Sequence, residues 1–257
     1  MGRVFKEKLA KGELVRLFAL GRLPSPVAIE VYGLSGGYDG LWLDQEHTGM
    51  SYDQILVAAL AAKVHGFDSF VRMAPLDYSL VTQNLETGVG GVMAARIESA
   101  AHAEEFVQWA KFAPRGSRGL NTSGRDSDYT FKPSTQFAED ANRDHLVAIQ
   151  IETLGALEEA DDIAAIDGVD VLFIGPSDLS QALGVLGQIQ HEKVWDGYAR
   201  VDQACRKHGK HWGTVGPTPE FIDRAIDLGC LMMTFGSELS ALRMGIAATK
   251  AQSAKYF

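Results

Sequence analysis

The sequence is poor in cysteine and has no long apolar run. Of its 257 residues only two are cysteine, Cys205 and Cys230, and they form no C-x-x-C pair. This excludes a disulfide scaffold and a thiolate zinc site. The longest apolar run, Ile55–Ala62, is far below the ~20 residues that span a bilayer, and the N-terminal stretch MGRVFKEKLAKGEL lacks the apolar core of a signal peptide. We therefore expect reduced thiols, a cytoplasmic protein and no membrane partner.

Positive charge is also scarce. The chain has 24 Lys and Arg against 33 Asp and Glu, a formal net charge of −9. Such a balance disfavours a nucleic-acid partner, which needs basic patches. Linkers and low-complexity blocks are missing too, while 46% hydrophobic and 22% charged residues are ordinary for a globular protein. Because α/β barrels often reach this length as one unit, we expect a single domain over residues 1–257.

Short β-type runs alternate with helical patterns along the chain. The expected strands are Leu14–Leu20, Gly40–Asp44, Ser69–Met73, Gly91–Ala95, Leu146–Ile151, Val169–Ile174, His211–Val215 and Leu231–Phe235. The expected helices are Tyr52–Val64, Ala101–Phe112, Gly155–Ile166, Glu192–His208, Pro219–Leu228 and Leu239–Ala251. This alternation predicts a (β/α)8 TIM barrel. A doubly wound open sheet is the competing interpretation, but no G-x-G-x-x-G motif follows the first strand.

Two segments leave alternatives open. Ala113–His145 has little periodicity, and we expect a long irregular loop that is either functional or a surface excursion or oligomer contact. Leu239–Ala251 has apolar residues on more than one face. That pattern fits either burial against a partner subunit or a buried final barrel helix.

Chemistry in an α/β barrel collects at the carboxyl ends of the strands. The polar residues at or after the ends of the expected strands are Asp44, Glu46, His47, Arg72, Arg96, Glu98, Gln150, Glu152, Ser177, Asp178, Thr214 and Thr218. Each alone has a structural explanation, such as a helix cap or an ion pair. Glu152 and Asp178 are about one strand–helix–strand unit apart, so we expect them at adjacent strand ends. Two carboxylates with open positions suit a hard divalent ion such as Mg²⁺ or Mn²⁺.

At these positions the sequence resembles the HpcH/HpaI aldolase family of class II, metal-dependent pyruvate aldolases, which have phosphoenolpyruvate/pyruvate-domain-like barrels. The resemblance covers essentially the whole chain. The motifs that carry it are Leu43–His47 (LDQEH), Phe70–Arg72 (FVR), Pro114–Gly119 (PRGSRG), Ile149–Thr153 (IQIET) and Phe173–Ser180 (FIGPSDLS). It implies a carbon–carbon lyase that forms a metal-bound pyruvate enolate and adds it reversibly to an aldehyde, giving a 4-hydroxy-2-oxoacid.

The resemblance also implies residue roles. Glu152 and Asp178 would hold the divalent ion, which could be Mg²⁺, Mn²⁺ or Co²⁺. Gln150 would contact the bound ligand or a metal-bound water, and the backbone N–H groups at Ser177 and Asp178 would bind the pyruvate carboxylate. Arg72 would stabilise the enolate oxygen, since a fixed positive charge belongs where negative charge develops.

His47, oriented by Asp44, would belong to an acid/base relay, because a carboxylate raises the basicity of a neighbouring imidazole. The expected assembly is a homo-oligomer, a trimer or hexamer with the last helix exchanged. The acidic residue that some members contribute across a subunit interface falls at Glu86.

The chain departs from the family pattern at the end of the fourth expected strand. A V-P-M-V-like run is replaced by Ala94-Ala95-Arg96-Ile97, and Leu120 is followed by Asn121 rather than glycine. We hypothesise that Arg96 binds a second carboxylate on the acceptor. A salt bridge to Glu98 or Glu46 is the alternative.

Three other functions fit less directly. A Schiff-base aldolase needs a lysine at a strand end, and no lysine of the sequence is expected there. Related enolate chemistry, such as citrate synthesis or cleavage or decarboxylative bond formation with an oxaloacetate-like substrate, would use the same site. A barrel that only binds a metal–oxoacid complex is the third.

Overall fold

In a computed structural model, which describes residues 4–257, the chain forms a closed barrel of eight parallel strands in sequence order. The strands are β1 (Val15–Leu20), β2 (Gly40–Asp44), β3 (Asp68–Met73), β4 (Gly91–Ala94), β5 (Leu146–Ile151), β6 (Val171–Ile174), β7 (His211–Val215) and β8 (Met232–Ser237). Strand β1 pairs with both β2 and β8, which closes the barrel. The predicted (β/α)8 fold is confirmed, and each predicted strand lies within about two residues of an observed one.

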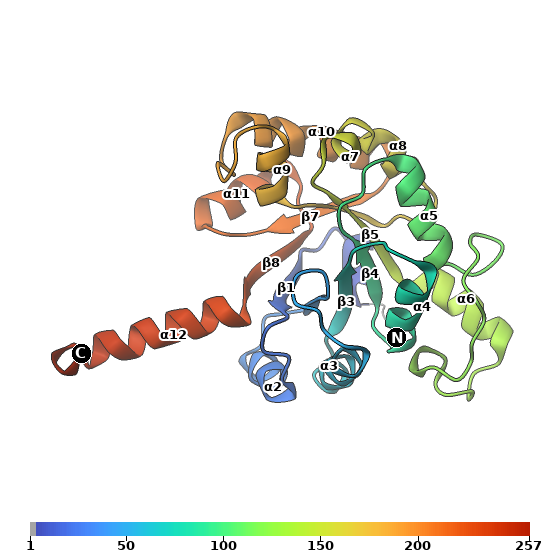
Figure 1. The fold of residues 1–257 in the computed structure, drawn as a ribbon, viewed down its shortest axis with the longest axis horizontal. Helices are drawn as coiled ribbons and strands as arrows, with labels where there is room; N and C mark the ends of the chain where they lie inside the picture. The colour runs from blue at the N-terminus through green and yellow to red at the C-terminus, as the bar shows by residue number, and fades with distance from the viewer. Residues whose placement is uncertain (1–3) are drawn as a thin grey trace.

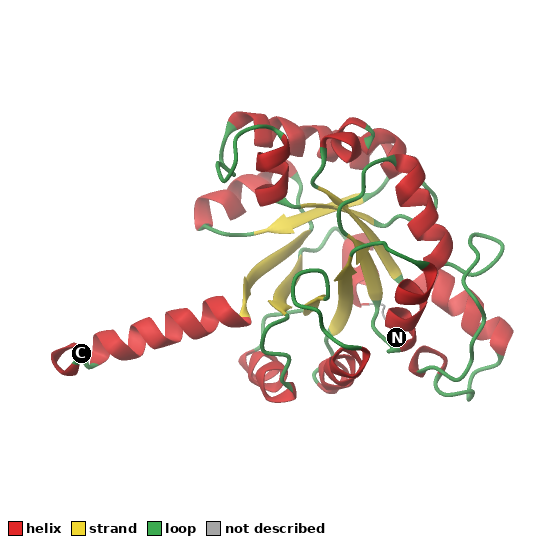
Figure 2. Cartoon of the chain, viewed as in Figure 1, coloured by secondary structure: helices red, strands yellow, loops and turns green. Residues whose placement is uncertain are grey.

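Helices surround this barrel (Figures 1 and 2). They are α1 (Val4–Ala10), α2 (Pro26–Ser35), α3 (Tyr52–Val64), α4 (Tyr78–Glu86), α5 (Ala100–Ala110), α6 (Ser134–Asp144), α7 (Leu154–Glu158), α8 (Ala160–Ala165), α9 (Pro176–Ala182), α10 (Glu192–His208), α11 (Pro219–Leu228) and α12 (Glu238–Gln252), with 3₁₀ turns η1 (Arg125–Ser127) and η2 (Ala254–Tyr256). No helix in residues 4–257 is long and apolar enough to cross a membrane.

Apolar side chains fill the barrel interior. Trp42, Phe70 and Phe173 pack against one another there, and Phe5 of α1 contacts Phe70. A larger apolar layer lies between the strands and the helices. Strands β3 and β5 are consequently buried at every position. Strands covered on both faces give continuous apolar runs, so a polar residue at the end of such a run marks the barrel mouth.

The prediction of an irregular segment over Ala113–His145 is wrong in part. The segment contains η1 and the eleven-residue helix α6. Helix α6 escapes a periodicity search because it is polar apart from a short apolar face that includes Phe137 and Ala141. The segment is also pinned by a buried ion pair, in which Arg118 contacts Asp126 at 2.5 Å. The expected helix Gly155–Ile166 is likewise two short helices, α7 and α8, that meet at Glu159.

Helix α12 projects away from the barrel (Figure 1). Its only buried residue in this chain is Glu238, whose Oε1 accepts hydrogen bonds from the backbone N–H groups of Gly21 and Arg22. The apolar side chains of Leu242 and Met244 are 50% and 72% exposed. The alternative of a buried final barrel helix is therefore wrong for this chain, and α12 leaves apolar surface uncovered.

Candidate active site

Arg72 forms the centre of one side of the barrel mouth. It is the penultimate residue of β3 and lies directly opposite Asp44 of β2 in the strand register. Its Nε and Nη2 atoms donate to the two Asp44 carboxylate oxygens at 3.1 and 2.9 Å, and its Nη1 lies 3.2 Å from Glu46 Oε2. The guanidinium also lies over the Trp42 ring, 4.8 Å from its centroid. Ion pairs and stacking thus hold this buried cation in one orientation.

His47 lies at the rim, with its side chain 61% exposed. Its Nε2 is 3.6 Å from Glu46 Oε2, whereas Asp44 contacts only its backbone N–H. The expectation that Asp44 orients the His47 ring is thus not met. The reason is the strand register, which places Arg72 opposite Asp44 and engages both of its carboxylate oxygens.

Glu152 forms the centre of the other side. It follows β5 and is almost fully buried. Gln150 Nε2 donates to its Oε2 at 2.5 Å, and the backbone N–H of Arg96 donates to its Oε1 at 2.7 Å. Burial raises the Glu152 pKa to about 7, with a further upward contribution from the negative charges of Glu46 and Asp178. The side chain is held in place, but its negative charge is poorly compensated.

Gly175 makes room for this arrangement. A Cβ at that position would lie 2.6 Å from Glu152 Oε2 and 2.7 Å from Gln150 Nε2. Any larger residue would therefore push both side chains aside. Gly175 precedes α9 and brings the chain from the end of β6 to Asp178 in the first turn of that helix.

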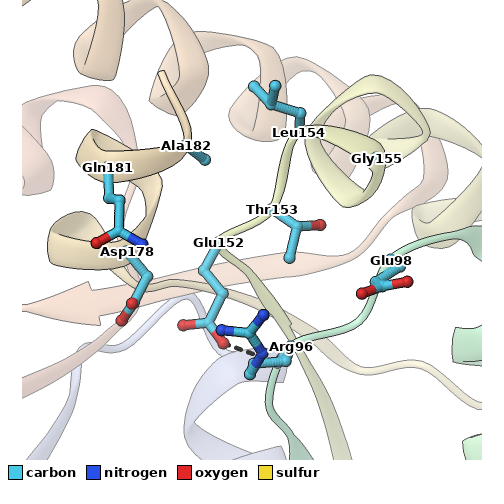
Figure 3. A pocket seen from close by; sticks show the side chains of 9 residues that line it. All are labelled: Arg96, Glu98, Glu152, Thr153, Leu154, Gly155, Asp178, Gln181 and Ala182. Carbon is cyan, nitrogen blue, oxygen red and sulfur yellow. Dashed lines mark hydrogen bonds between the residues drawn. The ribbon is translucent and has the colours of Figure 1, made fainter. Parts of the chain in front are cut away.

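Glu152 and Asp178 face a common cavity of about 450 Å³, which we call the carboxylate pocket (Figure 3). Its lining residues are Arg96, Glu98, Glu152, Thr153, Leu154, Gly155, Asp178, Gln181 and Ala182. The neighbouring residue Ser177 is exposed in the first helical turn of α9, where backbone N–H groups have no acceptor within the helix. The structure thus brings together the two predicted metal ligands.

The donor set of this pocket fits a divalent ion of the Mg²⁺ class. No cluster of three or more His, Cys, Asp or Glu side chains in residues 4–257 has a metal-binding arrangement. Two carboxylates are what Mg²⁺ uses when water and substrate supply its other ligands. Gln150 Oε1, a buried oxygen without a hydrogen-bond donor in the described residues, adds acceptor capacity nearby. A cation would also stabilise the ionised form of Glu152, whose pKa burial and the neighbouring carboxylates raise.

A second cavity, of about 330 Å³, has Arg72 and Asp44 in its lining. We call it the apolar pocket, and its lining residues are Ala19, Trp42, Asp44, Arg72, Val215, Gly216, Pro217, Thr234, Gly236, Ser237 and Ser240. Two buried polar atoms on it, Trp42 Nε1 and Thr234 Oγ1, lack a hydrogen-bond partner in the described chain. Arg72 and Asp44 therefore stand at the edge of a space that small molecules can enter.

Glu86 lies apart from these residues. It is the last residue of α4, at the opposite end of that helix from the mouth, and its side chain packs near Gly124. The structure does not bring Glu86 to the site of its own chain.

The buried Lys111 is also remote from the mouth. It donates to the backbone oxygen of His145, just before β5 begins.

Three residues that shape the site received no role in it from sequence reasoning, although Glu46 was among the polar strand-end residues. Glu46 bridges Arg72 and His47, Trp42 supports the guanidinium, and Gly175 leaves space for Glu152. The Trp42 position could have been found, because it lies two residues before Asp44 on the same strand and so shares its face. Nothing in the sequence pattern indicates which carboxylate Arg72 binds.

Comparison with known proteins supports this assignment. A family model described as HpcH/HpaI aldolase/citrate lyase matches residues 17–244. A 5-keto-4-deoxy-D-glucarate aldolase of Klebsiella pneumoniae is 30% identical over 239 residues, covering 93% of this chain and 92% of that protein. The crystal structure of an HpcH/HpaI aldolase from Desulfitobacterium hafniense has a TM-score of 0.89 at 29% identity, covering 98% of this chain and 96% of the other.

The citrate synthase SbnG has a TM-score of 0.87 at 25% identity and covers 98% of this chain and 97% of its own. The family match and the aldolase relatives support the prediction of a metal-dependent class II aldolase, a carbon–carbon lyase. This chain belongs to the HpcH/HpaI aldolase/citrate lyase family.

Proposed function

We propose that the protein is a class II aldolase that takes pyruvate and an aldehyde to a 4-hydroxy-2-oxoacid, and that catalyses the reverse cleavage. The observation that carries the proposal is the pairing of Glu152 and Asp178 on one side of the mouth with a fixed arginine, Arg72, on the other. A small 2-oxoacid needs two things from the site. The carboxylates hold a metal ion at its oxygens, and the arginine supplies a second positive charge that stabilises the enolate.

A divalent ion bound by Glu152 and Asp178 would act as a Lewis acid on the 2-oxo group and make the C3 proton of pyruvate more acidic. Mg²⁺, Mn²⁺ and Co²⁺ all suit two carboxylates completed by water and substrate oxygens. Gln150 donates its amide N–H to Glu152 and so fixes the orientation of that ligand. The backbone N–H of Ser177, in the first turn of α9, is available to the pyruvate carboxylate.

Arg72 would donate to the oxygen on which the enolate charge develops. Since Asp44 and Glu46 already orient it, little reorganisation is needed during the reaction. His47 would exchange a proton with the aldehyde oxygen from the rim. In this structure Glu46, rather than Asp44, is the carboxylate next to its Nε2.

Deuterium exchange into the methyl group of pyruvate tests the proposal without any aldehyde. Protein treated with EDTA should show no exchange in D₂O by proton NMR, and Mg²⁺, Mn²⁺ or Co²⁺, added back one at a time, should restore it. Exchange that persists in EDTA and in Glu152→Gln would contradict the proposal. A covalent adduct with pyruvate after borohydride reduction would contradict it as well.

The similarity to SbnG favours a second candidate, in which the same site performs citrate synthase-like or decarboxylative chemistry with an oxaloacetate-like substrate. Offering oxaloacetate with and without an aldehyde separates the candidates. Rapid loss of CO₂ from oxaloacetate, together with no cleavage of any 4-hydroxy-2-oxoacid, would favour this second candidate. A protein that only binds the metal–oxoacid complex would catalyse neither reaction.

We also propose a homo-oligomer, a trimer or hexamer, in which α12 packs on a neighbouring subunit. Supporting this are the exposed apolar side chains of the projecting helix, among them Leu242, Met244 and Ile246. Light scattering should show the oligomer, and Leu242→Glu should weaken it. Glu86 would then act on the site of the neighbouring subunit, so mixing inactive Glu86→Gln and His47→Gln subunits should restore activity.

A cytoplasmic location is part of the proposal. Both cysteines are buried and unpaired, as is usual for proteins of a reducing compartment. Fractionation of the source cells would test it.

A further inference from the structure

Arg96 differs from Arg72 in that its guanidinium has no partner among the described residues. It is exposed and lines the carboxylate pocket beside Glu152 (Figure 3). In residues 4–257 its guanidinium forms no hydrogen bond and no ion pair, either with Glu46 or with Glu98. The salt bridge considered as the alternative role for this residue is thus not present. A cation that lines a pocket and has no partner is available to a ligand.

The backbone fixes where this cation stands. Arg96 has φ 51°, in the left-handed region that a residue with a side chain rarely adopts. The residue is held there from three directions: its N–H donates to Glu152 Oε1, and its neighbours Ala95 and Ile97 are fully buried. Non-glycine residues persist in this conformation only where the surroundings over-determine it. The base of the side chain therefore has a fixed position relative to the proposed metal ligand.

The polar side chains of Thr153 and Gln181, which also line the pocket, do not pair with the Arg96 guanidinium. The Thr153 hydroxyl donates to the backbone oxygen of Ile97. Gln181 is exposed on α9, across the pocket, with its amide free of hydrogen bonds within the described residues. An amide and a guanidinium in one pocket offer several N–H donors and suit a carboxylate or phosphate group, to which arginine can donate two parallel hydrogen bonds.

We infer that Arg96 selects acceptors that carry an anionic group of their own, a carboxylate or a phosphate ester, in addition to the aldehyde. The inference rests on the proposed function, because it requires pyruvate to occupy the metal ligands Glu152 and Asp178. With those two carboxylates neutralised by a divalent ion, the charged side chains that remain in the lining are Arg96 and Glu98, and Arg96 is the one that can attract an anion. An acceptor bound next to pyruvate would reach Arg96 with its far end.

Matched acceptor pairs test this inference. Succinic semialdehyde and its methyl ester differ by a carboxylate charge, and glyceraldehyde 3-phosphate and glyceraldehyde differ by a phosphate. For each acceptor, kcat/KM is measured with saturating pyruvate in wild type, Arg96→Met and Arg96→Lys.

We expect wild type to prefer the charged member of at least one pair, and that pair identifies the anion. In Arg96→Met this preference should fall roughly 10- to 100-fold, as for the loss of a charged hydrogen bond. Arg96→Lys should retain part of this preference, because the positive charge stays while the paired N–H donors of the guanidinium are lost.

Arg200→Met is the matched control. Arg200 is an exposed arginine of α10 that donates to the backbone oxygen of Glu158 outside the pocket, so the variant removes the same charge without touching the site. The preference for the charged acceptor should be unchanged in this control.

An equal loss on charged and neutral acceptors in Arg96→Met, or a wild type without any preference for charge, would overturn the inference. Pyruvate exchange in D₂O is measured on the same samples: its absence in wild type would refute the proposed function instead, since no acceptor takes part in it.

Discussion

The two sides of the barrel mouth are built differently. On the side of β2 and β3, Arg72 is paired with Asp44 and Glu46 and lies over Trp42. We call this the arginine side. On the side of β4 to β6, which we call the carboxylate side, Glu152 is buried with a pKa raised to about 7, and the Arg96 guanidinium has no partner within residues 4–257.

This difference separates positioning from binding. The arginine side satisfies its own charges, so its geometry does not depend on a ligand, as preorganised electrostatic stabilisation requires. The carboxylate side holds negative charge that its own neighbours do not neutralise, and buried charges need a partner or a metal. We therefore expect changes on the carboxylate side to affect the binding of metal and substrate. Changes on the arginine side should affect the chemical step and the stability of the fold.

Glu152→Gln should have the largest effect. The substitution keeps the size of the side chain but removes the charge that would hold the ion, so metal-dependent exchange of pyruvate protons should fall roughly 10³-fold or more. The exchange rate is measured by NMR at several Mn²⁺ concentrations. Glu158→Gln is the control, because Glu158 is an exposed carboxylate of α7 outside the pocket, and it should behave as wild type.

Arg72→Met should come next, with a different pattern. It removes the cation facing the enolate, so exchange should fall roughly 10²- to 10³-fold while Mn²⁺ affinity stays within a few-fold of wild type. It also leaves Asp44 and Glu46 without their partner, which should lower the free energy of unfolding by about 3–5 kcal/mol.

Urea denaturation measures this stability term, with Lys207→Met as the comparison. Lys207 and Asp161 form an exposed pair, and breaking it should cost less than about 1 kcal/mol. A loss of Mn²⁺ affinity in Arg72→Met as large as that in Glu152→Gln would erase the distinction between the two sides.

Gly175→Ala should weaken metal binding about 10- to 100-fold, in the range found when the support of a ligand is disturbed. The added methyl group would displace Glu152 and Gln150. Gly197→Ala is its control, because a Cβ there would meet Leu179 and Leu157 only at the ordinary distances of 3.4–3.6 Å. Calorimetric titration with Mn²⁺ gives both affinities, and identical values would show that Gly175 has no part in the site.

Trp42→Leu should have the smallest effect. Arg72 would keep its two carboxylate partners and lose only the ring beneath it, a contribution of about 0.5–2 kcal/mol. The exchange rate should therefore fall by only about 2- to 30-fold, with unchanged Mn²⁺ affinity. A defect as severe as that of Arg72→Met would mean that stacking, rather than the ion pairs, orients the guanidinium.

The barrel itself was predictable, because its strands are buried on both faces and read as apolar runs. Helices were harder where their apolar residues do not face the core. In α2, Val27, Val31 and Leu34 are exposed, so the segment gives no amphipathic signal, and α6 is mostly polar. The polar strand ends located Glu152 and Asp178 correctly at one pocket, since the chain order fixes which strands are neighbours.

Side-chain partners were not predictable in the same way. The sequence places Asp44 close to both His47 and Arg72, and only the register of β2 against β3 decides that Arg72 takes its carboxylate. Gly175 could not be singled out, because its role depends on a close approach between residues of two different strands. Sequence order thus predicts which strand ends meet, whereas the contacts between their side chains require the three-dimensional structure.

The central claim is that Glu152 and Asp178 hold a divalent ion to which pyruvate binds. Electron paramagnetic resonance of Mn²⁺ tests it most directly, with water proton relaxation measured on the same samples. We predict that wild-type protein binds Mn²⁺ and that pyruvate lowers the relaxation enhancement by displacing water from the bound ion. The double variant Glu152→Gln/Asp178→Asn should bind neither Mn²⁺ nor pyruvate. Full Mn²⁺ binding by the double variant, or a wild-type signal indifferent to pyruvate, would contradict the account.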